Sequence, residues 1–396
     1  MYEHNSRLYK LISLFSFPVF WQPTLFLFLT LSKNLTSAQA LLLTSIYSLA
    51  VVFLEVPGGA VADHFSRKLS AALGFVIKGL GFLALTFASN YYILIVFMIV
   101  AAYGESLTSG SIESLMYDTV KQDGARDKYT FKKLYSSTRS LLHLTLAAYV
   151  AIGGFIGKFN LALPLQLSFV FYVIAAYISM KFIEPDKLHS EKSYIDHIKE
   201  GFAFVFSKDG YNKGISSLFI ADFFIIGLIS AVFWLTAPLL NDIKLNVMLI
   251  GLISASTRLI KSLGSYLVSK YNNPNDLHSM LVSVIIMVVL FVITSIFYVP
   301  LMVIVMLLGF SLIQGLYQAN DIQLLNDHIG TANRTTVNSI QNMFTRFYEF
   351  SVIPVIGLFI DKGQTSISIF LIATLLIIGL MILFFSRKKL SPEYYK

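Results

Sequence analysis

With 396 residues, of which 56% are hydrophobic and only 13% charged, the chain is far more apolar than a soluble protein. Its formal net charge of +8 does not indicate a nucleic-acid partner, because the basic residues lie between apolar runs rather than in one patch. The absence of cysteine excludes disulfides, thiolate metal sites and a cysteine nucleophile. The seven histidines show no metal-ligand spacing, and no ATP-binding or hydrolase motif occurs. We therefore expect no enzyme, no cofactor and no metal.

The chain begins with a polar segment, MYEHNSRLYK, which is followed by an apolar run at residues 11–31 that is long enough to cross a bilayer. A secretory signal peptide is the alternative, because residues 38–40 resemble a cleavage site. The run is too long for a signal core, however, and it contains Pro18 and Pro23. Windows of about 19 residues predict five further spans in the first half. They lie near residues 38–58, 70–88, 91–113, 135–157 and 162–183.

The polar segment 184–213 separates the two halves of the chain. Within it, Ile195, Ile198, Phe202 and Phe206 recur at helical spacing, which predicts an amphipathic helix on the inner leaflet that tethers the halves. A partner-binding helix is the alternative. Six more spans follow, near residues 214–240, 247–268, 277–297, 299–320, 336–360 and 365–385. The sequence thus predicts an all-α polytopic membrane protein with twelve transmembrane helices in two six-helix bundles, at 1–183 and 214–396.

The distribution of basic residues predicts the orientation. If both termini are cytoplasmic, 21 of the 30 Lys and Arg residues fall on the inner side and only four fall in outer loops. We therefore expect a multi-pass protein of the cytoplasmic (inner) membrane, with both termini inside.

A charged turn stands between the second and third predicted spans, in EVPGGAVADHFSRKLSAALGF at residues 55–75. Gly59, Asp63 and Arg67 are spaced four residues apart, and Lys68 follows. We predict that Pro57, Gly58 and Gly59 break the helix, and that Gly59 allows another backbone to approach closely. The four residues resemble the cytoplasmic loop between helices two and three of the major facilitator superfamily of secondary transporters. The resemblance implies that they form a gating loop.

Other segments support this resemblance. IGGFIGK at residues 152–158 returns as IGLFIDK at 356–362, and Gly59 has a degenerate counterpart in GSYLVSK at Gly264, at nearly the same offset. Such a repeat indicates duplicated halves, with a substrate site at mid-depth between them. SGSIESLMYDTVKQ at 109–122 and NRTTVNSI at 333–340 are similar to a bacterial branch of the superfamily that contains drug and metabolite exporters.

Ionisable residues within membrane spans are the first candidates for coupling, because they cost about 2.5 to 3.5 kcal/mol each on insertion scales. Glu105 and Glu349 lie near mid-depth of spans four and eleven, and Asp222 lies on span seven. We predict that they bind protons. The alternative is that they form permanent ion pairs, in which case Lys78 on span three neutralises Glu105.

Arg258 and Lys261 share one face of span eight, and Arg346 lies one turn from Glu349. These cations are predicted to neutralise the carboxylates or to receive an anionic substrate. Residues near cytoplasmic ends are better suited to gating pairs: Glu55, Glu113, Asp118, Arg139 and Asp321. The resemblance assigns further residues to spans that line the family's cavity: Trp21, Gln22, Tyr103, Phe233, Trp234, Tyr317 and Gln318. Lipid contact or packing is the alternative for each of them.

The leading interpretation is a secondary transporter that exports amphipathic small molecules by alternating access, driven by protons and functional as a monomer in the lipid bilayer. An uptake symporter for a polar or anionic metabolite is the first alternative, because of the basic residues in the spans. A membrane receptor or lipid-modifying enzyme that transports nothing is the second, although the sequence shows neither a soluble domain nor a catalytic constellation.

Overall fold

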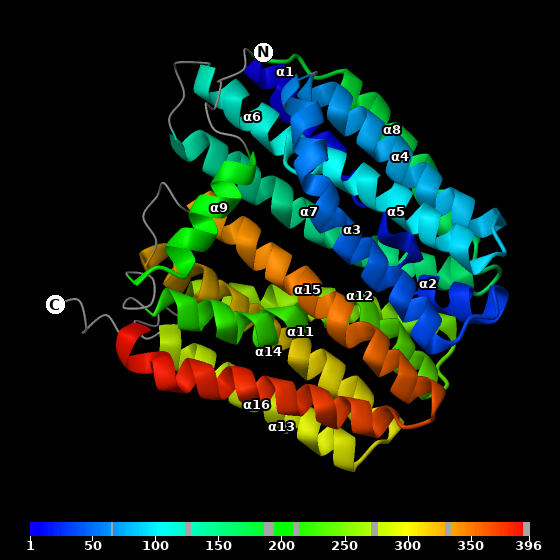
Figure 1. Cartoon of the computed structure of the whole chain (residues 1–396). Helices are drawn as coiled ribbons and strands as arrows, with labels where there is room; N and C mark the ends of the chain where they lie inside the picture. Colours follow the sequence, from blue (N-terminus) through cyan, green and yellow to red (C-terminus); the bar gives the residue numbers. More distant parts are fainter. Residues whose placement is uncertain are drawn as a thin grey trace. The chain divides into compact units, whose positions relative to one another are not determined.

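The computed structural model describes residues 1–64, 66–122, 128–185, 194–208, 214–270, 276–328 and 334–390, and every regular element in these ranges is a helix (Figure 1). Among the described residues, eleven helical segments are long and apolar enough to cross a membrane. The helices are α1 (Tyr2–Ser13), η1 (Val19–Trp21), α2 (Leu25–Leu27), η2 (Phe28–Ser32), α3 (Ser37–His64), α4 (Arg67–Phe87), α5 (Tyr91–Thr108), α6 (Ser111–Gln122), α7 (Lys128–Gly157), α8 (Leu163–Met180), α9 (Tyr194–Val205), α11 (Ile215–Asp242), α12 (Val247–Lys270), α13 (Asp276–Ile296), α14 (Pro300–His328), α15 (Arg334–Asp361) and α16 (Thr365–Leu390).

The predicted first span is not one continuous helix. α1 ends at Ser13, and the apolar residues that follow form the short segments η1, α2 and η2. Pro18 and Pro23 lack the N–H that a helix interior requires, so the chain breaks around them. The hydroxyl of Ser168 donates a hydrogen bond to the carbonyl of Pro18 at 2.7 Å, which satisfies one of the backbone carbonyls that the break leaves without a helical partner. The two prolines therefore divide the predicted span at 11–31 into short helical segments, and its apolar side chains are largely buried.

The predicted break at Pro57 does not occur. α3 continues through Pro57, Gly58 and Gly59 to His64, so the charged turn is shorter than the sequence suggested. A proline inside a long membrane helix is tolerated when neighbouring groups satisfy the freed backbone carbonyl. The next helix begins at Arg67, and the side chain of Ser66 caps it by accepting from the N–H of Leu69 at 3.3 Å.

The fourth predicted span contains a break that the hydropathy pattern did not reveal. α5 ends at Thr108 and α6 begins at Ser111, and between them Gly110 has φ +70°. Only glycine adopts this left-handed conformation without strain, so the sequence Ser-Gly at 109–110 stops one helix and starts the next. The turn separates Glu105 from Glu113.

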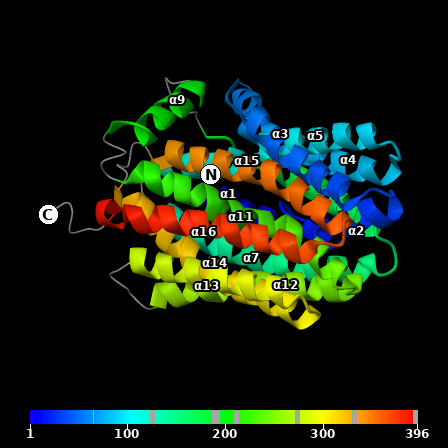
Figure 2. The same ribbon diagram turned by 60° about the horizontal axis from the view of Figure 1, so that its bottom comes forward.

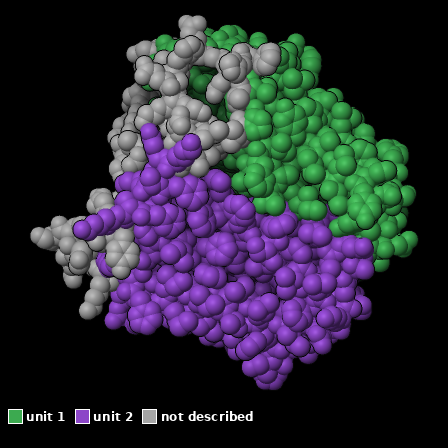
Figure 3. Space-filling model, viewed as in Figure 1, with its two compact units in different colours: residues 1–35, 46–191, 246–255 green, residues 36–45, 192–245, 256–396 purple. Residues whose placement is uncertain are grey.

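The described chain divides into two compact units, coloured separately in Figure 3. Unit 1 comprises residues 1–35, 46–191 and 246–255, and unit 2 comprises 36–45, 192–245 and 256–396. In unit 1, α4 packs against α5 and α8. In unit 2, α11 packs against α15 and α16, and α13 packs against α14 and α16, as Figures 1 and 2 show. The core of each unit is formed by apolar residues of these helices.

The segment between the predicted halves contains a helix, α9, which packs against α15 and α11 of unit 2. The ring of Phe202 lies 6.0 Å from the ring of Phe344, and the ring of Phe206 lies 6.4 Å from it. Part of the apolar face of this helix is therefore covered by protein.

Candidate functional site

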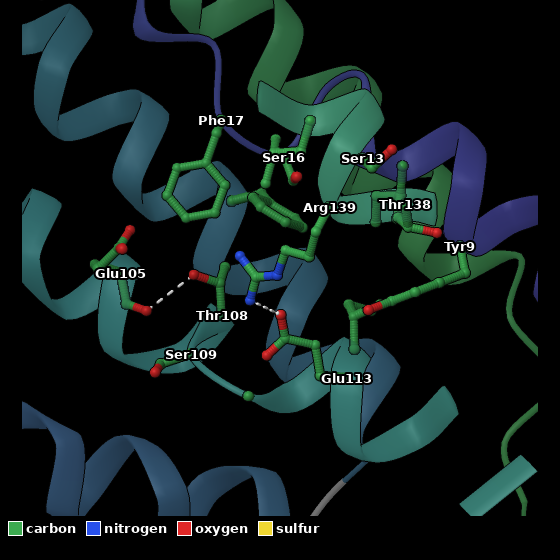
Figure 4. Close-up of a pocket in the computed structure, with 15 residues that line it drawn as sticks. Tyr9, Ser13, Ser16, Phe17, Glu105, Thr108, Ser109, Glu113, Thr138 and Arg139 are labelled. Atoms are coloured by element: carbon green, nitrogen blue, oxygen red, sulfur yellow. Dashed lines mark hydrogen bonds and ion pairs between the residues drawn. The ribbon is translucent and has the colours of Figure 1, made fainter. Parts of the chain in front are cut away.

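A pocket of about 210 Å³ lies within unit 1 (Figure 4). The turn at Gly110, between the end of α5 and the start of α6, forms part of its lining. Its lining combines apolar side chains with hydroxyl, carboxyl and guanidinium groups. The lining residues are Tyr9, Ile12, Ser13, Ser16, Phe17, Phe75, Glu105, Thr108, Ser109, Gly110, Ile112, Glu113, Thr138, Arg139 and Leu142.

Arg139 on α7 carries the positive charge in this pocket. Its Nη2 lies 2.5 Å from Oε1 of Glu113 on α6. The side chain of Arg139 is 39% exposed and that of Glu113 is 41% exposed. Figure 4 shows the guanidinium group reaching toward Glu113 across the pocket. Tyr9 on α1 lies on the same side of the pocket, and burial, with a smaller contribution from Glu113, raises the pKa of its phenol.

Glu105, a predicted proton site, is one of the residues that line the pocket, and its carboxylate forms an ion pair with Lys78 on α4. Lys78 is only 3% exposed. Its ammonium also lies over two rings, 4.8 Å from the centroid of Phe17 and 5.1 Å from that of Tyr172. The structure thus pairs Glu105 with Lys78, the alternative arrangement that the sequence left open.

The charged turn is tied down within unit 1. Arg67 forms an ion pair with Asp118 on α6. Glu184 accepts hydrogen bonds from the hydroxyl of Ser66 and from the N–H of Arg67, the latter at 2.5 Å. Arg67 therefore links the start of α4 to the end of the fourth span and to the segment after α8.

The other predicted gating residues make fewer described contacts. The side chain of Asp63 lies outside the described residues, and Lys68 is half-buried at the start of α4. A Cβ built at Gly59 would meet no described atom within 4 Å. Gly59 is therefore not a point of close backbone approach in this conformation, contrary to expectation.

In unit 2, Asp222 on α11 and Asp321 on α14 are each 2% exposed and share a donor. The Nε2 of Gln341 on α15 donates to Asp222 Oδ2 at 3.0 Å and to Asp321 Oδ2 at 3.3 Å. The hydroxyl of Tyr317 donates to Asp222 Oδ1 at 2.8 Å. Asp222 and Tyr317, which the sequence proposed for separate roles, thus belong to one cluster.

Glu349 on α15 is 3% exposed. Its Oε1 accepts from the hydroxyl of Ser230 on α11, and its Oε2 has no hydrogen-bond partner among the described residues. The expected ion pair with Arg346, one turn earlier, is not among the ion pairs of the described ranges. Arg346 is half-buried. A hydroxyl therefore takes the place of the expected cation.

Arg258 and Lys261 on α12 are half-buried, and both belong to unit 2. The guanidinium of Arg258 lies 5.3 Å from the ring centroid of Phe233, a cation–π contact. Phe233 in turn meets the ring of Trp234 edge-on at 5.0 Å. Gln318 is half-buried on α14.

The remaining predicted cavity residues belong to unit 1. Trp21 stacks on Phe82 at 4.9 Å, and both Trp21 and Gln22 are buried. Tyr103 is half-buried on α5. None of these three lines the pocket at Gly110.

Sequence reasoning missed three polar partners: Glu184, Ser230 and Gln341. Each lies in a segment assigned to a linker or a membrane span, and its importance depends on which helix lies opposite. Gln341 and Asp222 are separated by 119 residues, as are Glu349 and Ser230. This equal separation shows that α11 and α15 run in the same direction. Within the described ranges, no group of three His, Asp or Glu side chains is arranged to hold a metal ion.

Comparison with known proteins gives consistent matches. The model of the Major Facilitator Superfamily matches residues 11–348. The uncharacterized MFS-type transporter YxaM of Bacillus subtilis (strain 168) is 26% identical over 232 residues, or 57% of this chain. That match spans 56% of the relative, just over half of its length.

Two solved structures share the fold. The nucleoside transporter NupG has a TM-score of 0.79 at 14% identity, over 97% of this chain and 99% of that one. A D-xylose-proton symporter has a TM-score of 0.76 at 13% identity, over 97% of each chain. At these identities the likeness concerns the fold alone. The family model covers most of the sequence, and the chain therefore belongs to the Major Facilitator Superfamily, a family of membrane transporters rather than enzymes.

Proposed function

We propose that the chain is a secondary transporter that exports amphipathic small molecules in exchange for protons, by alternating access. The pocket at Gly110 is the observation that carries this proposal. Its apolar walls, which include Phe17 and Leu142, suit a hydrophobic body, while Arg139, Glu113 and Glu105 supply sparse polar contacts. The substrate class therefore combines an apolar ring system with one or two polar or charged groups.

Proton coupling is supported by carboxyl groups buried among membrane helices. A proton drives transport only if it binds the two open states unequally. Of the three predicted sites, Glu105 already has a cation, whereas the described contacts of Glu349 and Asp222 include no cation. We therefore give Glu349 and Asp222 precedence as proton-binding residues.

The topology belongs to the same proposal. The protein is a monomer in the cytoplasmic membrane with both termini inside, and it consists of bundles at 1–183 and 214–396 joined by the segment 184–213. The turn that contains Gly59, Asp63, Arg67 and Lys68 acts as a gate rather than a binding site. The ion pair between Arg67 and Asp118 supports this role, because it fixes the position of the turn.

An uptake symporter for a polar or anionic metabolite is the second candidate. Arg258 and Lys261 favour it, because two cations three residues apart on α12 suit an anionic group. The solved structures that share the fold include a nucleoside transporter and a xylose-proton symporter, which move polar solutes.

Flux in proteoliposomes tests both candidates. Purified protein is reconstituted, a pH gradient is imposed, and the accumulation of ethidium is compared with that of uridine and xylose. Exchange for protons predicts that ethidium accumulates in the acidic compartment and that a protonophore abolishes the accumulation. Accumulation of uridine or xylose in the alkaline compartment, with none of ethidium, would instead establish the symporter.

A further inference from the structure

Three helices of unit 2 bring two carboxyl groups together away from the solvent. Asp222 is contributed by α11 and Asp321 by α14, and the side-chain amide of Gln341 on α15 donates to both. One nitrogen atom therefore serves both carboxyl groups, Oδ2 of Asp222 at 3.0 Å and Oδ2 of Asp321 at 3.3 Å. An ionised carboxylate only accepts hydrogen bonds, so two ionised aspartates at this donor have nothing to donate to each other, whereas a proton on one of them supplies a donor.

The remaining atoms of the cluster agree with a single proton. Asp222 Oδ1 accepts from the hydroxyl of Tyr317, and Asp321 Oδ1 has no hydrogen-bond partner among the described residues. Two full negative charges at this place would repel each other in a buried environment with only neutral donors. One charge, spread over two carboxyl groups and stabilised by the amide of Gln341 and by Tyr317, avoids this cost.

No cation is paired with the two aspartates in the described ranges. Their described hydrogen bonds come from Tyr317 and Gln341, and neither aspartate belongs to a described ion pair. No ionisable residue occurs on α16 between residues 365 and 386. α12 packs on α14 at Gly315 and carries Arg258, Lys261, Tyr266 and Lys270. The other ionisable groups described on neighbouring helices are Lys199 and Glu200 on α9, His278 on α13, Arg346, Tyr348, Glu349 and Asp361 on α15, and Asp242 at the far end of α11.

We propose that Asp222 and Asp321 share one proton and that this pair is the site at which transport is coupled to protons. The coupling role rests on the proposed function, whereas the shared proton does not. Loss of the proton leaves two charged carboxylates on one donor, and their repulsion pushes α14 away from α11 and so changes the relative stability of conformations. Glu349 lies eight residues beyond Gln341 on α15, about 12 Å away along the helix axis, and is a separate site.

Infrared spectroscopy tests the shared proton without any substrate. A Glu349→Gln protein lacks the other buried carboxyl group proposed to bind a proton. It is expected to show the carbonyl band of a protonated carboxyl group at neutral pH, and the band disappears on alkaline titration. Adding Asp222→Asn or Asp321→Asn to this protein should remove the band, because the new amide donates to the remaining carboxylate. Asp242→Asn is the matched control on α11; its side chain still accepts from Tyr298, and the band should persist.

Absence of the band from the Glu349→Gln protein, or its persistence after both aspartate substitutions made singly in that protein, would overturn the inference. Labelling of the wild-type protein with dicyclohexylcarbodiimide, which modifies protonated carboxyl groups in apolar surroundings, keeps the test decisive if a variant does not fold. Mass spectrometry should locate the label on Asp222 or Asp321 and not on Glu105. A label on Glu349 alone contradicts the proposal.

Flux measurements then test the coupling. Asp222→Asn and Asp321→Asn should lose pH-gradient-driven accumulation, and their substrate exchange should no longer depend on pH. Asp242→Asn should still accumulate substrate. If the band is lost in both variants while gradient-driven accumulation persists, the proton is structural and the coupling role is wrong. If the wild-type protein itself accumulates no tested compound under either gradient, the proposed function fails, and the infrared result on the shared proton still stands.

Discussion

At the scale of single residues, the ion pair between Lys78 and Glu105 determines the charge balance beside the pocket. The side chain of Lys78 is 4% exposed and that of Glu105 is 17% exposed, so removal of the Lys78 charge leaves a carboxylate with little water to solvate it. We expect Lys78→Met to lower the free energy of unfolding by about 3 kcal/mol, because breaking a buried ion pair is far more costly than replacing it whole. The double variant Lys78→Met with Glu105→Gln should recover most of this loss.

Thermal and denaturant unfolding of the detergent-solubilised protein measures these differences. The pair of Arg139 with Glu113 is the control, because its side chains are about ten times more exposed than that of Lys78. Arg139→Met should therefore cost less than about 1 kcal/mol. Equal losses at Lys78 and Arg139 would show that burial does not set the strength of these pairs.

The sequence predicted some of the pairs of polar side chains and not others. Lys78 and Glu105 were recognisable because ionisable residues are rare in apolar spans and lie at similar depth. The partners of Asp222 and Glu349 were not recognisable, because a glutamine or a serine in a span carries no comparable signal. Arg346 shows the opposite error: the spacing of three residues from Glu349 was correct, but the hydroxyl of Ser230 on another helix binds the carboxylate.

At the scale of elements, close packing of α4 on α5 depends on Gly104. A Cβ built there would lie 2.3 Å from the backbone N of Lys78 and 2.5 Å from the carbonyl O of Gly74, both of them rigid helix atoms. We expect Gly104→Ala to destabilise the protein by about 2 kcal/mol, because the helices must separate. Gly59→Ala should instead stabilise it by about 0.5 to 1 kcal/mol, since no described atom lies nearby and alanine favours a helix. The melting temperatures of the two variants should shift in opposite directions; a shift in the same direction contradicts this account.

The repeat at residues 356–362 includes a helix cap. The carboxylate of Asp361 at the end of α15 accepts from the N–H groups of Ser37 at 2.6 Å and Ala38 at 3.0 Å, which begin α3. A negative charge at a helix N-terminus is stabilising, so Asp361→Ala should cost about 1 kcal/mol and Asp361→Asn less. Chemical denaturation of the three proteins measures the order. If Asp361→Asn is as unstable as Asp361→Ala, the cap does not provide the stability.

The positions of helices were predictable where hydropathy determines them. They were less predictable where proline or glycine can break a helix. The sequence placed spans close to α4, α8 and α11 because an apolar run of that length has no other stable form in a bilayer. It gave similar weight to Pro18 and Pro57, although one stands in a broken segment and the other in a continuous helix. The outcome depends on whether neighbouring groups satisfy the freed backbone, which the sequence does not reveal.

At the scale of the whole molecule, the proposed gating role of the turn at Gly59 to Lys68 requires that the turn favour one open state over the other. We expect Asp63→Asn to shift the populations of the two open states while ligand affinity of a locked state changes little. Distances between spin labels in the two units, measured by electron paramagnetic resonance, report the populations. Lys199→Gln on α9, which also removes one charge, is the control and should leave the distance distribution unchanged. An unchanged distribution in Asp63→Asn would exclude the turn as a gate.

Proton exchange is the central claim, and the internal pH of unbuffered proteoliposomes tests it most directly. Vesicles contain a trapped pH-sensitive dye, potassium and valinomycin hold the membrane potential at zero, and ethidium is added outside while its uptake is recorded. Exchange of substrate for protons predicts that the interior becomes alkaline as ethidium enters, and that Asp222→Asn abolishes the pH change. Ethidium uptake by the wild-type protein with no change of internal pH, or with acidification, would contradict the claim.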